Sequence, residues 1–94
     1  ENIFSRQIEA IGNSGDILIS LSTSGNSRNV LNGIQTAKKK SITTITFLGK
    51  DGGACKGLSD YEIMIPSKST ARVQEMQLFL GHILCDMIDE HLPK

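Results

Sequence analysis

The sequence predicts an α/β layered fold in which parallel strands alternate with helices. Residues 17–21 form a nearly continuous apolar run of strand length, which is typical of a strand buried on both faces of a parallel sheet. Residues 43–48 are rich in β-branched side chains and predict a second strand, and a helical pattern separates the two runs. This order of elements favours parallel strands joined by right-handed crossovers, with the 17–21 strand at the centre of the sheet.

The remaining elements follow from apolar periodicity and from residues that end it. A short helix is expected over residues 2–11, before the turn at residues 12–15. A second helix carries Val30, Leu31, Ile34 and Ala37 on one face and ends at three lysines, 38–40, which suit the negative end of a helix dipole.

A third strand at residues 61–65 stops at Pro66, and a long helix is expected over residues 71–91, capped by Ser69 or Thr70. Only three strands are recognisable, and the first residue is Glu1 rather than Met. We therefore expect a fragment whose further strands precede Glu1.

Apolar residues lie on two sides of the long helix. A core stripe is predicted within about 100° of arc at 100° per residue, and it consists of Val73, Met76, Leu80, Ile83, Leu84 and Met87. The opposite side holds Leu78 and Cys85 beside Gln74, His82 and Asp89. This second side is expected to meet another subunit; the alternative is that it is simply exposed or covered by the rest of the protein.

Composition excludes several classes of function. The 94 residues allow one domain, and ten basic and ten acidic side chains cancel, so nothing favours nucleic acid or an anionic membrane as a partner. Neither a bilayer-spanning run nor a signal peptide is recognisable, and we expect a soluble, cytoplasmic protein. Cys55 and Cys85 lack CxxC or His-rich spacing and are expected to be free thiols.

The loop after the first strand has the chemistry of a phosphate site. Hydroxyl side chains and backbone N–H groups lie where a buried strand turns into a helix, at the carboxyl edge where ligands of open α/β sheets gather. Gly25 would let the backbone approach a ligand, and Asn26 is a candidate helix cap. By spacing alone, an ordinary Ser/Thr-rich capping loop remains the alternative. The hydroxyl donors are Ser22, Thr23, Ser24 and Ser27.

Three segments in order resemble phosphoheptose isomerases of the sugar isomerase (SIS) fold: LSTSGNS at 21–27, GKDGG at 49–53, and ARVQE at 71–75 continued by HILCDMID at 82–89. The resemblance implies a three-layer αβα sandwich with a flavodoxin-like parallel sheet, of which residues 1–94 would be the C-terminal part of one SIS domain. It also implies conversion of sedoheptulose 7-phosphate to D-glycero-D-manno-heptose 7-phosphate for ADP-heptose and lipopolysaccharide synthesis, in a homotetramer. In that family the serines and threonine of the first segment bind the sugar phosphate.

The resemblance further implies roles for two residues of the long helix. Gln74 would bind substrate. Gln74 and His82 would both bind the active-site metal, zinc, together with a histidine and a glutamate that precede Glu1. The two side chains are separated by about 80° around the helix and about 12 Å along it. They could therefore act in one site of the same chain or in a site shared between subunits, and both alternatives remain open. His82 is also expected to act as the acid or base that moves a proton, beside a glutamate absent from this chain.

Other assignments stay open at this stage. Lys50 and Asp51, after the second strand, either touch substrate or form a solvated turn. Two rival functions are a non-catalytic SIS protein that binds a partner, as in regulators of replication initiation, and a phosphosugar-sensing domain of a transcription regulator. The presence of both Gln74 and His82 favours the enzyme.

Overall fold

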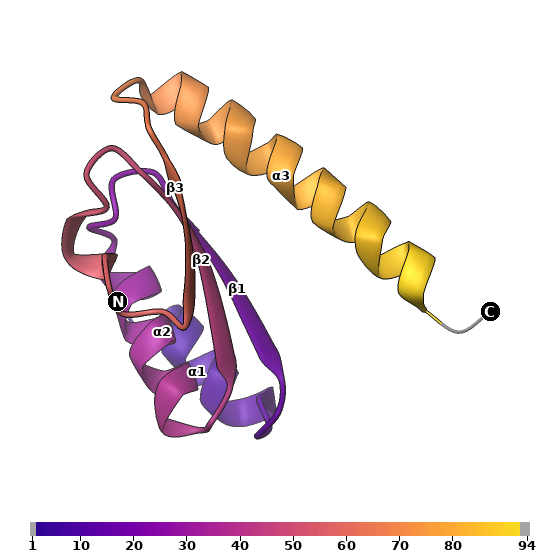
Figure 1. Cartoon of the computed structure of the whole chain (residues 1–94). Coiled ribbons are helices and arrows are strands. Elements are labelled where there is room, and N and C mark those ends of the chain that lie inside the picture. The colour runs from indigo at the N-terminus through magenta and orange to yellow at the C-terminus, as the bar shows by residue number, and fades with distance from the viewer. Residues whose placement is uncertain (1, 93–94) are drawn as a thin grey trace.

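A computed structural model describes residues 2–92 as three helices around a three-stranded parallel sheet (Figure 1). The chain runs α1 (Ile3–Ile11), β1 (Ile17–Ser22), α2 (Arg28–Lys39), β2 (Thr43–Gly49), the short 3₁₀ helix η1 (Gly53–Cys55), β3 (Tyr61–Ile65) and α3 (Thr70–His91). All three predicted strands and all three predicted helices are present, and the fold class is confirmed.

The strands lie in the order β1-β2-β3 and both pairs are parallel. Ile19 is paired with Ile45, and Ile45 is in turn paired with Tyr61. Because side chains alternate along a strand, these three residues share one face of the sheet. Thr44 and Thr46, both fully buried, belong to the other face.

Helices cover both faces, which gives the three layers expected (Figure 1). The pair α1 and α2 lies against one face, where Phe4, Ile8 and Val30 approach Leu18 of β1. The long α3 lies on the opposite side, beside β2 and β3. The carboxyl ends of all three strands therefore open at one edge, into the loops that precede α2, η1 and α3.

The central strand is β2, so the prediction that residues 17–21 form the central strand was wrong for this chain. β1 is an edge strand, and Ile17 and Leu21 are 63% and 48% exposed. A continuous apolar run shows that a strand can be covered on both faces, but the run does not show which elements cover it.

The core is centred on Ile34 of α2, Leu48 of β2 and Cys55 of η1. Cys55 and Cys85 are both free, as predicted, with Cys55 buried and Cys85 exposed. Burial raises the pKa of the Cys55 thiol, and the negative charge of Glu62 adds to this effect.

The first part of α3 is the part that packs most closely. Val73 is fully buried, Leu80 and Leu84 are half-buried, and the rest of the predicted core stripe, Met76, Ile83 and Met87, is exposed, so this prediction was partly wrong. In Figure 1 the helix diverges from the sheet toward its C-terminal end, which removes the later residues from the core. Leu78 and Cys85, on the side expected to meet a subunit, are exposed.

Hydroxyl side chains begin the two longer helices. The Ser27 hydroxyl accepts a hydrogen bond from the Val30 N–H at the start of α2, and Ser69 does the same for Arg72 at the start of α3. Ser69 was predicted as a cap, whereas the assignment of Asn26 to the cap of α2 was wrong by one residue. None of the helices within residues 2–92 has the length and apolar character needed to cross a membrane.

Candidate functional site

An open cavity of about 620 Å³ lies at the carboxyl edge of the sheet. It is bounded by the connections that follow all three strands, which is where ligands bind in open α/β sheets. Its wall consists of Ser24, Asn26, Lys50, Asp51, Pro66, Ser67 and Lys68.

The loop of residues 22–27, called the serine loop below, has hydroxyl groups that accept hydrogen bonds from nearby backbone N–H groups. Ser22 Oγ is buried and accepts from the Gly25 N–H at 3.0 Å, and Ser24 Oγ accepts from the Asn26 N–H at 3.1 Å. Ser27 Oγ accepts from the Val30 N–H at 3.5 Å while it caps α2. A hydroxyl that accepts in this way can still donate its own hydrogen to a ligand, so three oriented donors surround the positive end of α2.

The serine loop is fixed against the connection between β2 and β3. Gly25 has a φ of +74°, and a Cβ at this position would overlap the carbonyl oxygen of Gly52. The Gly25 carbonyl accepts a hydrogen bond from the Cys55 N–H at 2.9 Å, and Asn26 Oδ1 accepts from the Ala54 N–H at 2.9 Å. The cavity wall is therefore bonded together before any ligand arrives.

The start of α3 approaches the same loop from the other side. A Cβ added to Gly49, the last residue of β2, would meet the side chain of Val73 and, at 2.7 Å, the carbonyl oxygen of Thr23. Only glycine allows these three segments to come so close. Thr23 itself is half-buried within the serine loop.

The predicted site residues thus fall into two groups. Ser22, Thr23, Ser24 and Ser27 share one loop, and of these four Ser24 lines the cavity. Gln74 and His82 are both exposed on α3 and lie outside the wall of the cavity. Within residues 2–92 there is no cluster of three or more His, Cys, Asp or Glu side chains suited to a metal ion. Because zinc takes three or four protein ligands, the described residues do not by themselves fit a zinc centre.

The sequence analysis missed Ser67 and Lys68, which line the cavity after β3. The same reasoning that selected the loop after β1 applies to every parallel strand and would have selected these residues too. Lys50 and Asp51, whose roles the sequence left open, also line the cavity. Asp51 Oδ1 accepts a hydrogen bond from the Gly53 N–H at 2.9 Å and so also shapes its turn.

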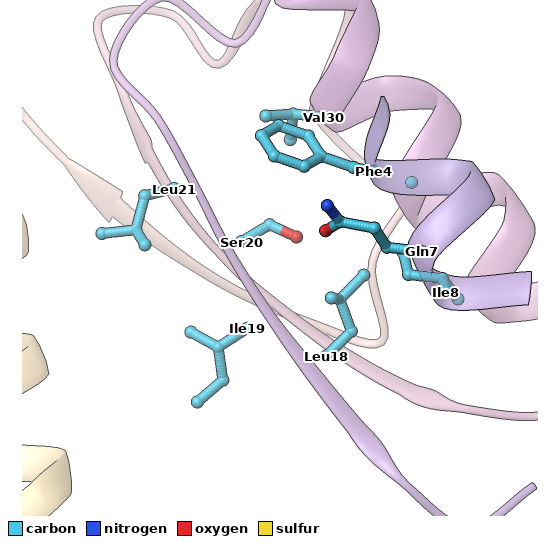
Figure 2. Close-up of a pocket in the computed structure, with 9 residues that line it drawn as sticks. Phe4, Gln7, Ile8, Leu18, Ile19, Ser20, Leu21 and Val30 are labelled. Atoms are coloured by element: carbon cyan, nitrogen blue, oxygen red, sulfur yellow. The ribbon is translucent and has the colours of Figure 1, made fainter. Parts of the chain in front are cut away.

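A second cavity, of about 260 Å³, lies between α1 and β1 and is mainly apolar. Phe4, Gln7 and Val30 extend toward it from the helices and Ser20 from β1, whereas Ile19 and Leu21 point to the other side of the strand (Figure 2). It contains none of the predicted site residues and is not at the carboxyl edge. The larger cavity is therefore the candidate site.

Comparison with known proteins gives a consistent set of relatives. The chain is 48% identical over 92 residues to a phosphoheptose isomerase of Sulfurimonas denitrificans and 51% identical over 92 residues to one of Clostridium acetobutylicum, covering 98% of this chain and 47% of each relative. The chain spans about half the length of the curated relatives it matches. No protein-family model matches it.

Two solved structures have the same fold over nearly the whole chain. A phosphoheptose isomerase from Francisella tularensis superposes with a TM-score of 0.91 at 37% identity, covering 95% of this chain and 50% of that one. The enzyme from Neisseria gonorrhoeae gives a TM-score of 0.89 at 38% identity, covering 93% and 50%.

Proposed function

Because the chain belongs to the phosphoheptose isomerase family, we propose that the protein that carries it converts sedoheptulose 7-phosphate to D-glycero-D-manno-heptose 7-phosphate. This reaction supplies heptose for ADP-heptose and lipopolysaccharide. The 94 residues would form part of a single SIS domain, and an active site would need residues beyond them.

The observation that carries the proposal is the bonding of the serine loop. Ser22, Ser24 and Ser27 each accept a backbone N–H, which leaves their hydroxyl hydrogens for the oxygens of a phosphate at the N-terminus of α2. Thr23 adds a fourth hydroxyl in the same loop. In this proposal the four residues bind the phosphate and so hold the sugar chain at the carboxyl edge of the sheet.

Isomerisation moves one proton between neighbouring carbons and another between their oxygens. We assign His82 as one acid/base, because imidazole changes protonation near neutral pH and its ring is exposed on α3. A glutamate outside the chain would be its partner. Gln74, eight residues earlier on the same helix, would contact the substrate.

Gln74 and His82 would also each contribute one donor to a zinc centre. Such a centre would need further ligands from outside residues 2–92. When bound, zinc would polarise substrate oxygens; the proton transfers above depend on the side chains.

The proposal extends to assembly and location. Leu78 and Cys85 are exposed on α3, and burial of this face against another copy would support a homotetramer. The two free cysteines suit a reducing compartment, the cytoplasm.

The test is conversion of sedoheptulose 7-phosphate by the protein that carries this chain, compared with its His82→Ala and His91→Ala variants. His91 is a matched control, because it is an exposed histidine of the same helix. Loss of a general acid or base typically costs 10²–10⁴-fold in kcat, so H82A should lose activity while H91A keeps it. Equal activity in H82A and H91A would remove His82 from the mechanism. Binding without turnover in the parent protein would instead indicate a non-catalytic sugar-phosphate-binding protein.

A further inference from the structure

Two lysines line the candidate cavity, and the proposed role of the serine loop does not involve them. Lys50 follows β2, Lys68 follows β3, and both are exposed. The ion pair found within residues 2–92 joins Arg72 and Glu75, so neither lysine is neutralised by a partner there. Because Asp51 shares the connection of Lys50, the cavity lining carries two positive charges and one negative charge.

The backbone of Lys50 supports a role beyond solvation. Lys50 has a φ of +55°, in the left-handed region that a non-glycine residue seldom adopts. Ser41, the other such residue in the described chain, follows the end of α2, where this conformation is common. Lys50 directly follows a strand, and residues held in such conformations are concentrated at functional sites.

The two lysine-bearing connections are also bonded to each other. The Lys50 N–H donates to the Ser67 carbonyl at 3.1 Å, and the Ser67 N–H donates to the Ile65 carbonyl at 2.8 Å. Ser67 Oγ accepts from the Ser69 N–H at 3.1 Å, which joins this connection to the cap of α3. The bases of both lysine side chains are thus fixed, which lowers the entropy lost when the side chains bind a ligand.

Charge identifies the ligand group. The serine hydroxyls and the end of α2 offer hydrogen bonds and partial charge, but no full positive charge. A phosphate monoester carries about −1.5 to −2 charges at pH 7, and lysine is a common phosphate-binding residue that acts as a mobile point charge. Two ammonium groups beside Ser24 outweigh the single carboxylate of Asp51, which accepts a hydrogen bond from the Gly53 N–H, and so can offset part of such a charge.

We infer that Lys50 and Lys68 bind the phosphate group of the ligand together with Ser24, and that they favour the dianionic form of the phosphate. This inference rests on the proposed function for the identity of the ligand. According to this inference, residues on all three connections contribute to the phosphate affinity, and not the serine loop alone.

The test measures binding of inorganic phosphate by calorimetry to the protein that carries this chain and to its Lys50→Met and Lys68→Met variants. Each variant should raise the phosphate Kd roughly three- to fivefold, which is the upper part of the range for a solvent-exposed charge interaction. Lys50→Arg and Lys68→Arg keep the charge and should remain within about twofold of the parent protein. The matched control is Lys39→Met, which removes an exposed lysine at the end of α2.

Salt dependence and a serine variant complete the experiment. The phosphate affinity of the parent protein should fall more steeply with added salt than that of the double variant K50M/K68M, because salt screens exposed charges. Unchanged binding in K50M and K68M, with binding lost in Ser24→Ala, would overturn the role of the lysines and leave the proposed serine site intact. If K39M weakened phosphate binding as much as K50M and K68M do, the loss would reflect the net charge of the protein. That result would also overturn the role of the two lysines. A parent protein that binds no phosphate would refute both the inference and the proposed function.

Discussion

Asn26 and Ala54, 28 residues apart, are joined by a hydrogen bond of 2.9 Å from the Ala54 N–H to Asn26 Oδ1. The bond ties the serine loop to η1, beside the contact between Gly25 and Gly52. The geometry of the serine loop therefore depends on a segment beyond the next strand.

Two substitutions of Asn26 should distinguish the stability of the serine loop from the effect of charge on phosphate binding. Asn26→Ala removes the acceptor and should lower the free energy of unfolding by about 1 kcal/mol, the usual value of such a bond. Asn26→Asp keeps an acceptor, so it should stay closer to the parent in urea denaturation, yet its negative charge at the cavity wall should weaken phosphate binding more than N26A does. If N26D bound phosphate as well as the parent, the ligand would lie away from Asn26.

Gly25 should tolerate no side chain. Gly25→Ala combines a φ of +74° with overlap of the Gly52 carbonyl, and we expect a loss of roughly 2–4 kcal/mol in unfolding free energy. Gly15→Ala is the matched control, because Gly15 has a φ of +92° but no atom within 4 Å of the added Cβ. It should cost only about 1 kcal/mol, for the backbone conformation alone. Equal urea midpoints for the two variants would show that the serine loop can move away from the Gly52 carbonyl without a loss of unfolding free energy.

The strands, the helices and the serine loop could be predicted because they depend on local patterns. A continuous apolar run located β1, a group of β-branched residues located β2, and Pro66 marked the end of β3. The change from strand to helix located Ser22 and Ser24. The cap of α2 was placed one residue early because Asn and Ser are equally good caps. In the structure the side chain of Asn26 does not cap α2, because its Oδ1 accepts a hydrogen bond from Ala54, which is distant in sequence.

Tertiary contacts also explain the other errors. Whether β1 is central depends on what pairs with it, and the sequence of β1 itself does not contain that information. Gln77 was missed because a glutamine between apolar helix positions is usually solvated, whereas here it is 5% exposed and donates to the Phe47 carbonyl of β2 at 3.1 Å. Lys68 was missed because the reasoning from the carboxyl edge of the sheet was applied to the residues after β1 and β2 but not to those after β3.

The buried carboxamide of Gln77 should matter for stability. Gln77→Leu has a similar volume but leaves the Phe47 carbonyl without this donor, and a buried unsatisfied acceptor costs about 1–3 kcal/mol. Gln74→Leu, an exposed position on the same helix, should stay within about 0.5 kcal/mol of the parent in urea denaturation. A Q77L protein as stable as the parent would mean that the Phe47 carbonyl does not need the Gln77 donor and that apolar contacts such as those of Val73 hold α3.

Asp60 should make the stability of the chain depend on pH. The backbone N–H of Thr44 donates to Asp60 Oδ2 at 2.9 Å and is the main cause of a lowered pKa; partial desolvation opposes it, and the Thr44 hydroxyl and the charge of Lys38 add to the lowering. Because the folded-state pKa lies below the unfolded value of about 3.9, the carboxylate stabilises the fold above that value. This contribution is lost as the pH falls through the folded-state pKa.

The measurement is the urea midpoint of the parent protein and of Asp60→Asn between about pH 2 and pH 7. The parent should exceed D60N by a constant margin near neutral pH. The margin should begin to shrink as the pH falls below about 4 and should be lost once the pH has passed the lower folded-state pKa, where Asp60 is protonated in the folded protein too. Thr44→Val removes the hydroxyl but keeps the backbone N–H, so it should retain most of the pH dependence. A margin that persisted unchanged at pH 2 would show that the charge of Asp60 does not stabilise the pairing of β2 with β3, and that the hydrogen bonds act equally on the protonated group.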